Sequence, residues 1–113
     1  MKSKYIAALL CFALLLLTSC GSPLPDNKKD YAGEWRSTTV YLYIGSDGSV
    51  NYVHQDAGVK TTINAPIQKF DGDNFEVGAL GINTTFVVSA KPHLVDGVWK
   101  MTVDGRELTR YSK

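Results

Sequence analysis

Few residues of this chain have the type and spacing that catalysis or metal binding requires. The two histidines, His54 and His93, lie in different segments and form neither a His-x-His nor a His-Glu-x-x-His pattern, so they predict no zinc site. The run DGDN at 71–74 carries hard oxygen ligands but lacks the later bidentate acid of a calcium loop, and we interpret it as a hairpin turn. No serine stands in a nucleophile-elbow motif. We therefore expect a protein that is not an enzyme and has no catalytic residues, metal site or cofactor.

The thiol of Cys20 is the one reactive group in a recognisable setting. It follows an apolar run of about a dozen residues, 6–17, which Lys2 and Lys4 precede. This run has the length of a signal-peptide core and falls short of the ~20 residues that cross a bilayer as a permanent helix. The sequence LTSCG at 17–21 resembles the bacterial lipobox, in which an aliphatic residue and two small residues precede a cysteine. The resemblance implies cleavage before Cys20 and attachment of a diacylglyceryl group to its thiol.

Lipidation of Cys20 would fix the protein to a membrane, because each buried acyl methylene contributes ~0.8 kcal/mol. Residues 1–19 are then a lipoprotein signal peptide. The same resemblance implies a location: Gly21, rather than Asp, after the cysteine is typical of Gram-negative lipoproteins sorted to the outer membrane. We expect a protein of the cell envelope that faces the periplasm. An ordinary secretory signal with a cysteine placed by chance is the alternative.

Charge and cysteine usage narrow the function classes. Loss of Lys2 and Lys4 with the leader leaves 10 basic against 11 acidic residues, a net charge of −1. Since no basic stripe exists, we do not expect a nucleic-acid partner. The cysteines, Cys11 and Cys20, both lie in or beside the leader, so no disulfide can staple the folded domain. The domain must be held by burial and hydrogen bonding alone.

Residues 20–30 predict a lipidated cysteine followed by a tether. The segment GSPLPDNKKD at 21–30 has two prolines, four charges and little apolar content, which is typical of a flexible linker. A flexible linker of about ten residues spans roughly 17–20 Å and would lift the domain clear of the lipid headgroups. The folded domain is expected over residues 31–113.

The pattern from Tyr31 onward predicts strands. Short runs rich in Val, Ile, Thr and aromatic residues alternate in polarity, as in VYLYI at 40–44 and VWKMTV at 98–103. Four Asp-Gly pairs, at 47–48, 71–72, 96–97 and 104–105, predict tight hairpin turns because both residues adopt left-handed backbone. The expected fold is all-β, a small antiparallel up-and-down meander barrel of about eight strands, with a two-sheet β-sandwich as the alternative.

The opening Gly33-Glu34-Trp35, the meander and a basic residue in the last strand resemble the lipocalin and calycin superfamily. The resemblance implies that Trp35 lies across the closed end of the barrel and that an arginine of the last strand stacks on it. Arg110 is the expected partner and Arg106 the substitute, and such a stack contributes ~0.5–2 kcal/mol. The alternative is an ordinary core tryptophan. Lipocalins are nearly twice as long as this chain, and short strands leave little lumen.

Tyr41 and Tyr43 are the candidate partner-binding residues. They alternate with Val40, Leu42 and Ile44, so aliphatic side chains inside place both tyrosines outside, where rigid aromatic faces recognise a protein or a glycan. The expected function is a non-catalytic binding or protein-interaction module that engages an envelope protein, peptidoglycan or another periplasmic component. The alternative for the tyrosines is that flanking residues or a neighbouring loop cover them.

The alternative function is a lipocalin-like carrier of a small apolar ligand. It requires an interior cavity lined by side chains that the alternation directs inward. The candidates are Leu42, Ile44, Tyr52, Phe86, Val88, Trp99 and Met101.

Overall fold

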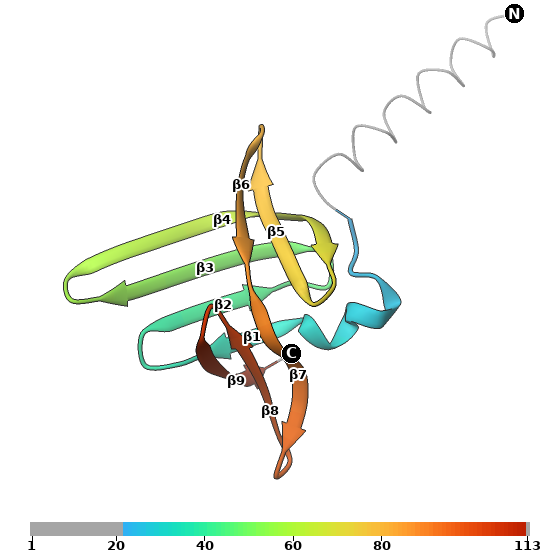
Figure 1. Cartoon of the computed structure of the whole chain (residues 1–113), viewed down its shortest axis with the longest axis vertical. Helices are drawn as coiled ribbons and strands as arrows, with labels where there is room; N and C mark the ends of the chain where they lie inside the picture. The colour runs from blue at the N-terminus through green and yellow to red at the C-terminus, as the bar shows by residue number, and fades with distance from the viewer. Residues whose placement is uncertain (1–21, 113) are drawn as a thin grey trace, which may run out of the picture.

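Nine antiparallel strands form one continuous sheet in the computed structural model, which describes residues 22–112 (Figure 1). The predicted leader 1–19 and Cys20 lie outside the described residues. A 3₁₀ helix, η2 (Asp26–Tyr31), precedes the strands. The strands are β1 (Gly33–Arg36), β2 (Val40–Ile44), β3 (Ser49–Asp56), β4 (Val59–Asp71), β5 (Asn74–Ala79), β6 (Ile82–Phe86), β7 (Val88–Val95), β8 (Val98–Val103) and β9 (Arg106–Ser112).

The all-β meander predicted from sequence is confirmed, as one curled sheet rather than a two-sheet sandwich. The strand order is β6-β5-β4-β3-β2-β1-β9-β8-β7. Each strand pairs with the next one in the chain except β6, which does not pair with β7, and β1 also pairs with β9. The sequence predicts about eight strands and the structure has nine among the described residues; β7 is the hardest to recognise, because it carries Lys91, Pro92 and His93 and shows no clean alternation. Proline is tolerated in β7 because this strand lies at an edge of the sheet, where one side of the backbone needs no ladder partner.

The connection between β6 and β7 forces the sheet to curl. These strands stand at opposite ends of the strand order, yet only Val87 separates them in the chain (Figure 1). Three hydrogen bonds fix the chain at this connection: the Val88 N–H donates to Asn74 Oδ1 at 2.8 Å, the Val87 N–H donates to Asp104 Oδ1 at 2.9 Å, and the Asp104 N–H donates to the Val87 carbonyl at 2.8 Å. The sheet therefore forms a half-barrel whose two edge strands, β6 and β7, are joined through Val87 and are not paired by a ladder.

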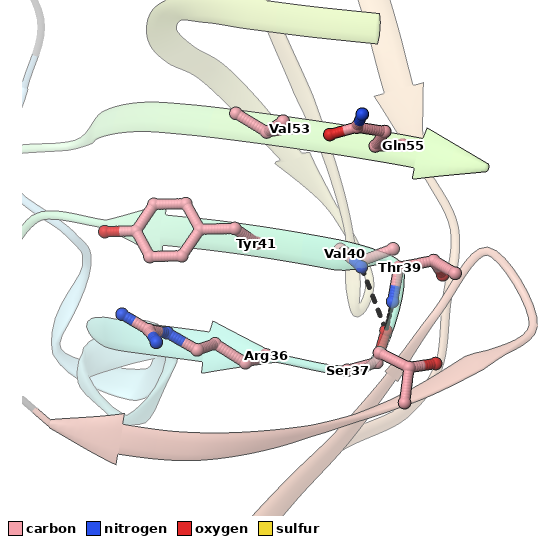
Figure 2. A pocket seen from close by; sticks show the side chains of 8 residues that line it. Arg36, Ser37, Thr39, Val40, Tyr41, Val53 and Gln55 are labelled. Atoms are coloured by element: carbon pink, nitrogen blue, oxygen red, sulfur yellow. Dashed lines mark hydrogen bonds between the residues drawn. The ribbon is translucent and has the colours of Figure 1, made fainter. Parts of the chain in front are cut away.

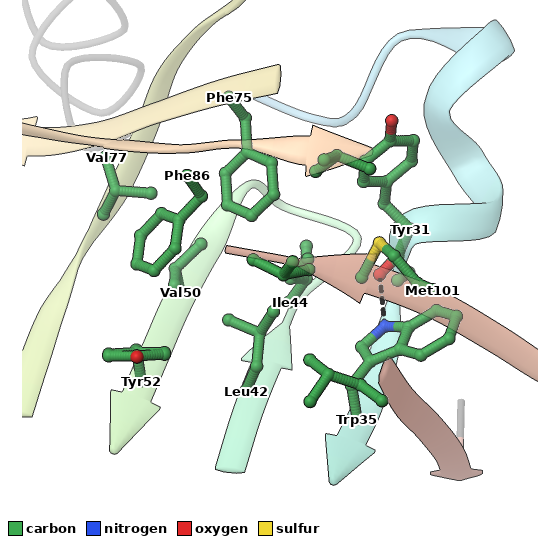
Figure 3. Close-up of a cluster of buried hydrophobic side chains, with 14 of the residues drawn as sticks. Tyr31, Trp35, Leu42, Ile44, Val50, Tyr52, Phe75, Val77, Phe86 and Met101 are labelled. Atoms are coloured by element: carbon green, nitrogen blue, oxygen red, sulfur yellow. Dashed lines mark hydrogen bonds between the residues drawn. The ribbon is translucent and has the colours of Figure 1, made fainter. Parts of the chain in front are cut away.

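The concave face of the half-barrel encloses the hydrophobic core. Side chains from β5 and β6 meet those from β2 and β3, as Figure 3 shows. Phe86 packs against Tyr52 with ring centroids 4.9 Å apart and stacks on Phe75 at 5.1 Å. The inward alternation predicted for Val40, Leu42 and Ile44 is confirmed, since all three are buried.

Tight turns with left-handed backbone join the hairpins. Asp96-Gly97 and Asp104-Gly105 have positive φ at both residues, the geometry of a type I′ turn, and all four predicted Asp-Gly pairs lie at strand connections. Ala57-Gly58 and Leu80-Gly81 make the same turn without aspartate. All of these turns have glycine as the second of their two central residues, and this glycine is the sequence feature that they share.

The segment predicted as a flexible tether is packed against the sheet where the structure describes it. Leu24 is 3% exposed, and η2 carries Tyr31 into the core. The Tyr31 hydroxyl donates to the Asp73 carbonyl at 2.8 Å, and its ring meets Phe70 and Phe75 edge-on. Composition did not predict this packing, because it depends on a single apolar residue of the segment, Leu24, which distant residues hold against the core.

Among residues 22–112, no helix combines the length and the apolar character needed to span a bilayer.

Tyr31 gives the fold a specific sensitivity to alkaline pH. Burial, and to a smaller extent the Asp73 carboxylate, raises the pKa of Tyr31 to about 12 from its ordinary value of 10. The unfolded chain therefore loses the Tyr31 proton at a lower pH than the folded chain does. The contribution of this group to folding stability is fully present below pH 10 and is lost as the pH rises to 12. A rise in pKa from 10 to about 12 corresponds to about 2–3 kcal/mol of unfolding free energy.

We expect urea midpoints measured between pH 9 and pH 12 to fall more steeply for the native protein than for Tyr31→Phe. Phenylalanine keeps the ring but has no proton to lose, so the difference between the two curves isolates this residue from the other tyrosines. Parallel curves for the two proteins would show that the hydroxyl is accessible in the folded state.

Candidate functional site

A shallow groove lies beside the turn that joins β1 to β2 (Figure 2). Its volume is ≈ 360 Å³, near the lower limit for small-ligand sites, and it is open to solvent. The Ser37 hydroxyl shapes the turn, because its Oγ accepts hydrogen bonds from the backbone N–H groups of Thr39 and Val40. The groove is rich in hydroxyl, amide and guanidinium groups; its lining is Arg36, Ser37, Thr38, Thr39, Val40, Tyr41, Val53 and Gln55.

The guanidinium group of Arg36 is held between two aromatic rings at one side of this groove. It lies 5.2 Å from the ring centroid of Tyr41 and 5.2 Å from that of Tyr111. Arg36 is 3.6 Å from Glu34 Oε2, and 47% of its side chain remains exposed. The cation is thus positioned before any partner arrives, while much of its five-donor fork still faces solvent. We call Glu34, Arg36, Tyr41 and Tyr111 the arginine cluster.

Strand pairing brings the arginine cluster together on the convex face. Arg36 is directly opposite Tyr41 in the β1–β2 ladder. Between β1 and β9 the register shifts at Glu34 and Trp35, so that Trp35 faces Arg110 and Glu34 faces Ser112. Tyr111 is the extra residue of this β-bulge, and its 68% exposed side chain reaches Arg36.

The hydroxyl of Tyr41 is tied to the same cluster. It donates to Glu34 Oε1 at 3.1 Å. Partial burial, this hydrogen bond and the negative charge of Glu34 raise the pKa of Tyr41, so the hydroxyl keeps its proton to a higher pH than an ordinary tyrosine does. The arrangement offers positive charge, aromatic faces and hydroxyl groups, and it has the composition of a recognition surface.

The two predicted partner-binding tyrosines are both on the outside, as expected, but they serve different hollows. Tyr41 is half-buried and lines the groove, whereas Tyr43 is exposed and lines a second hollow of ≈ 390 Å³ together with Lys29, Gly33 and Ser46. This second hollow lies at the other end of β2. The two tyrosines therefore remain neighbours on the outer face of β2, but each lines a different hollow.

The predicted stack between Trp35 and Arg110 is confirmed. The Arg110 guanidinium lies 5.5 Å from the ring of Trp35 and 4.6 Å from that of Trp99, and it donates to the carbonyls of Asp30 and Ala32. Arg110 thus joins the last strand to η2, while the substitute, Arg106, is half-buried at the start of β9. The indole Nε1–H of Trp35 donates to the Tyr31 carbonyl at 2.8 Å, which fixes the ring (Figure 3).

Six of the seven residues predicted to line a ligand cavity are buried in the core. These are Leu42, Ile44, Tyr52, Phe86, Val88 and Met101. Trp99 differs, since it is only half-buried: it packs against the edge of the core and carries the Arg110 guanidinium over its ring. The buried six pack against one another and against Phe75 and Val77, so these side chains occupy the interior that a carrier would leave open.

The two histidines lie on strands of the sheet, and the acidic run at 71–74 joins β4 to β5. His93 is exposed on β7, with Nδ1 2.8 Å from the Lys91 carbonyl, and His54 is half-buried on β3. In the 71–74 run, Asp73 faces Lys28 at 3.6 Å, consistent with the expected hairpin turn. Within the described part of the chain, no group of three His, Cys, Asp or Glu side chains is placed to hold a metal ion.

Sequence inspection missed Arg36 and Tyr111, and also two apolar hairpin tips. Leu80 and Ile82 are exposed at the β5–β6 tip, and three further apolar residues are exposed at the β7–β8 tip: Leu94, Val95 and Val98. Alternation predicts which face a strand residue occupies, but not that a hairpin extends beyond the core and leaves both of its faces in solvent.

Comparisons with protein-family models, with curated proteins and with solved structures give no match for this chain.

Proposed function

We propose that this protein is a lipid-anchored, non-catalytic binding module of the bacterial cell envelope, and that it recognises a polar protein partner at the groove and the arginine cluster. The lipobox resemblance around Cys20 supports the anchor and the envelope location. The packed core supports recognition at the surface rather than transport of an apolar ligand in an interior lumen.

The observation that carries the proposal is the preset guanidinium of Arg36. Holding a long, flexible side chain in one geometry costs side-chain entropy, and here the rings of Tyr41 and Tyr111 have already fixed it. Arginine and tyrosine are, with tryptophan, the residues enriched among interface hot spots. A carboxylate of the partner would meet a planar fork of N–H donors beside hydroxyl-lined space for the neighbouring chain.

The test is recovery of partners from intact membranes by crosslinking to the lipidated protein. We expect Arg36→Ala to reduce recovery at least about tenfold, because hot-spot truncations cost ~2 kcal/mol or more. Tyr41→Ala should act in the same direction. Tyr43→Ala, in the separate hollow, is the matched control and should leave recovery nearly unchanged.

A Cys20→Ser protein tests the anchor in the same experiment. We expect it to leave the membrane fraction and to lose the mass of the acyl groups. Recovery that is unchanged by Arg36→Ala and Tyr41→Ala would exclude the arginine cluster. A native Cys20 without lipid would exclude the anchor, and recovery of peptidoglycan fragments alone would replace the protein partner by a glycan.

A further inference from the structure

The first described residues of the chain are fastened to one end of the sheet. We call residues 22–25 the strap. The Leu24 N–H donates to the Ser46 carbonyl at 3.1 Å, and the Leu24 side chain is buried in the core. The Ser22 carbonyl oxygen lies so close to Gly48 that a Cβ at this glycine would collide with it. The strap is thus seated on the β2–β3 turn from its first described residue.

The chain stays attached after the strap. In η2, the Lys28 ammonium donates to the Gly72 carbonyl at 2.7 Å and pairs with Asp73 at 3.6 Å. Between the strap and β4, a hollow of ≈ 300 Å³ is lined by Pro23, Leu24, Ile67 and Phe70, among others. Between Ser22 and Tyr31 there is no stretch that could act as a free linker.

Covalent geometry then limits the distance between the anchor and the domain. Cys20 precedes Ser22 by two residues, and an extended chain covers at most ~3.6 Å per residue. The lipid-bearing residue therefore lies within about 7 Å of the docked strap, compared with the roughly 17–20 Å that a free ten-residue linker would span.

The groove lies at the other end of the same strands. β2 runs from Val40, in the groove, to Ile44, next to the β2–β3 turn on which the strap rests. β3 then runs from Ser49, beside that turn, to Asp56, near the β3–β4 turn. Seven residue steps of strand span about 23 Å. Figure 1 shows the β1–β2 and β3–β4 turns on the side of the sheet opposite to the blue segment that contains the strap.

We propose that the strap end of the domain rests directly on the lipid bilayer surface, so that the groove and the arginine cluster are presented away from the membrane. The partner of the strap end is the lipid surface itself. The inference rests on the proposed lipidation of Cys20 and adds an orientation to it: the anchor holds the domain in one pose instead of trailing it on a tether.

The experiment uses the lipidated protein in vesicles that contain a headgroup-linked quencher. Single variants, Ser46→Cys at the strap end and Val59→Cys at the β3–β4 turn, each carry one thiol-linked fluorophore; both side chains are exposed. We expect quenching at position 46 to be clearly stronger than at position 59, because the two ends are ~23 Å apart and headgroup quenching falls steeply with distance.

A flexible spacer tests whether the short connection to Cys20 holds the strap end at the bilayer, or whether this end binds lipid by itself. Inserting about 20 Gly and Ser residues between Gly21 and Ser22 leaves the strap intact and adds roughly 25 Å of slack. We expect the spacer to lower quenching at position 46 to the level seen at position 59. Strong quenching at position 46 that persists with the spacer would show that this end binds lipid by itself, and would overturn the role given to the short connection.

Counting free thiols distinguishes the two possible failures. A thioether at Cys20 leaves only the engineered thiol for the fluorophore, whereas an unmodified Cys20 adds another. More than one free thiol would refute both the lipid anchor and the proposed contact of the strap end with the bilayer. One free thiol together with equal quenching at positions 46 and 59 would refute only the proposed contact of the strap end with the bilayer.

Discussion

Replacing Trp35 by alanine is expected to destabilise the domain by about 3–5 kcal/mol, as full truncation of a buried tryptophan commonly does. Its side chain is 0% exposed. The change removes the indole from the core, breaks the Nε1–H bond to the Tyr31 carbonyl and leaves the Arg110 guanidinium without one of its two rings. Domains of this size are stable by roughly 5–15 kcal/mol, so the loss is a large share of the total.

Urea unfolding followed by circular dichroism measures this loss. Trp35→Phe separates the parts: it keeps most of the apolar volume but leaves the Tyr31 carbonyl unpaired, and should cost about 1–3 kcal/mol. Tyr111→Ala, at an exposed aromatic residue of the neighbouring strand, is the control and should change stability by about 0.5 kcal/mol or less. Equal effects of Trp35→Ala and Tyr111→Ala would contradict the placement of Trp35 in the core.

Replacing Leu24 by alanine is expected to cost about 2–3 kcal/mol, near the lower end of the range for buried leucines, because a short strap can partly relax into the space. Leu24 is 3% exposed, and its neighbours in the strap hold the β2–β3 turn and flank Ile67 and Phe70. The prediction is informative because composition assigned this segment to a free linker, for which the same change would cost nothing.

Leu80→Ala is the matched control for this experiment. Leu80 is fully exposed at the β5–β6 tip and should tolerate the change within about 0.5 kcal/mol. A Leu24→Ala protein as stable as Leu80→Ala would mean that the strap does not dock in solution, and the proposed seat on the membrane would lose its basis. Denaturant midpoints of the two variants decide between these outcomes.

Trp35→Ala and Leu24→Ala both test the connection between the proposed lipid anchor and the sheet, because this connection consists of the strap and η2. Trp35 binds the last residue of η2, and Arg110 binds the Asp30 and Ala32 carbonyls on either side of that residue. The strap is thereby continuous with the core, and β1, which begins two residues after η2, carries Arg36 to the opposite end. The structure thus links the two ends through one short strand.

Local patterns of the sequence determined the class of fold. Alternation in VYLYI is a property of adjacent residues, and it assigned Val40, Leu42 and Ile44 to the core and Tyr41 and Tyr43 to the outside. The Asp-Gly pairs marked turns because their backbone preference needs no distant partner. The stack of Arg110 on Trp35 followed from the lipocalin resemblance, and the structure confirmed it.

Tertiary structure alone decided the arginine cluster, the curl of the sheet and the position of the strap. Arg36 meets Tyr111 only because the first strand pairs with the last and because a bulge inserts one extra residue there. The edges meet because one residue, Val87, connects the two ends of the strand order. Leu24 is buried by residues that follow it by more than 20 positions. These contacts depend on which strands pair and in which register, whereas periodicity in a sequence reports only the face that each residue occupies within its own strand.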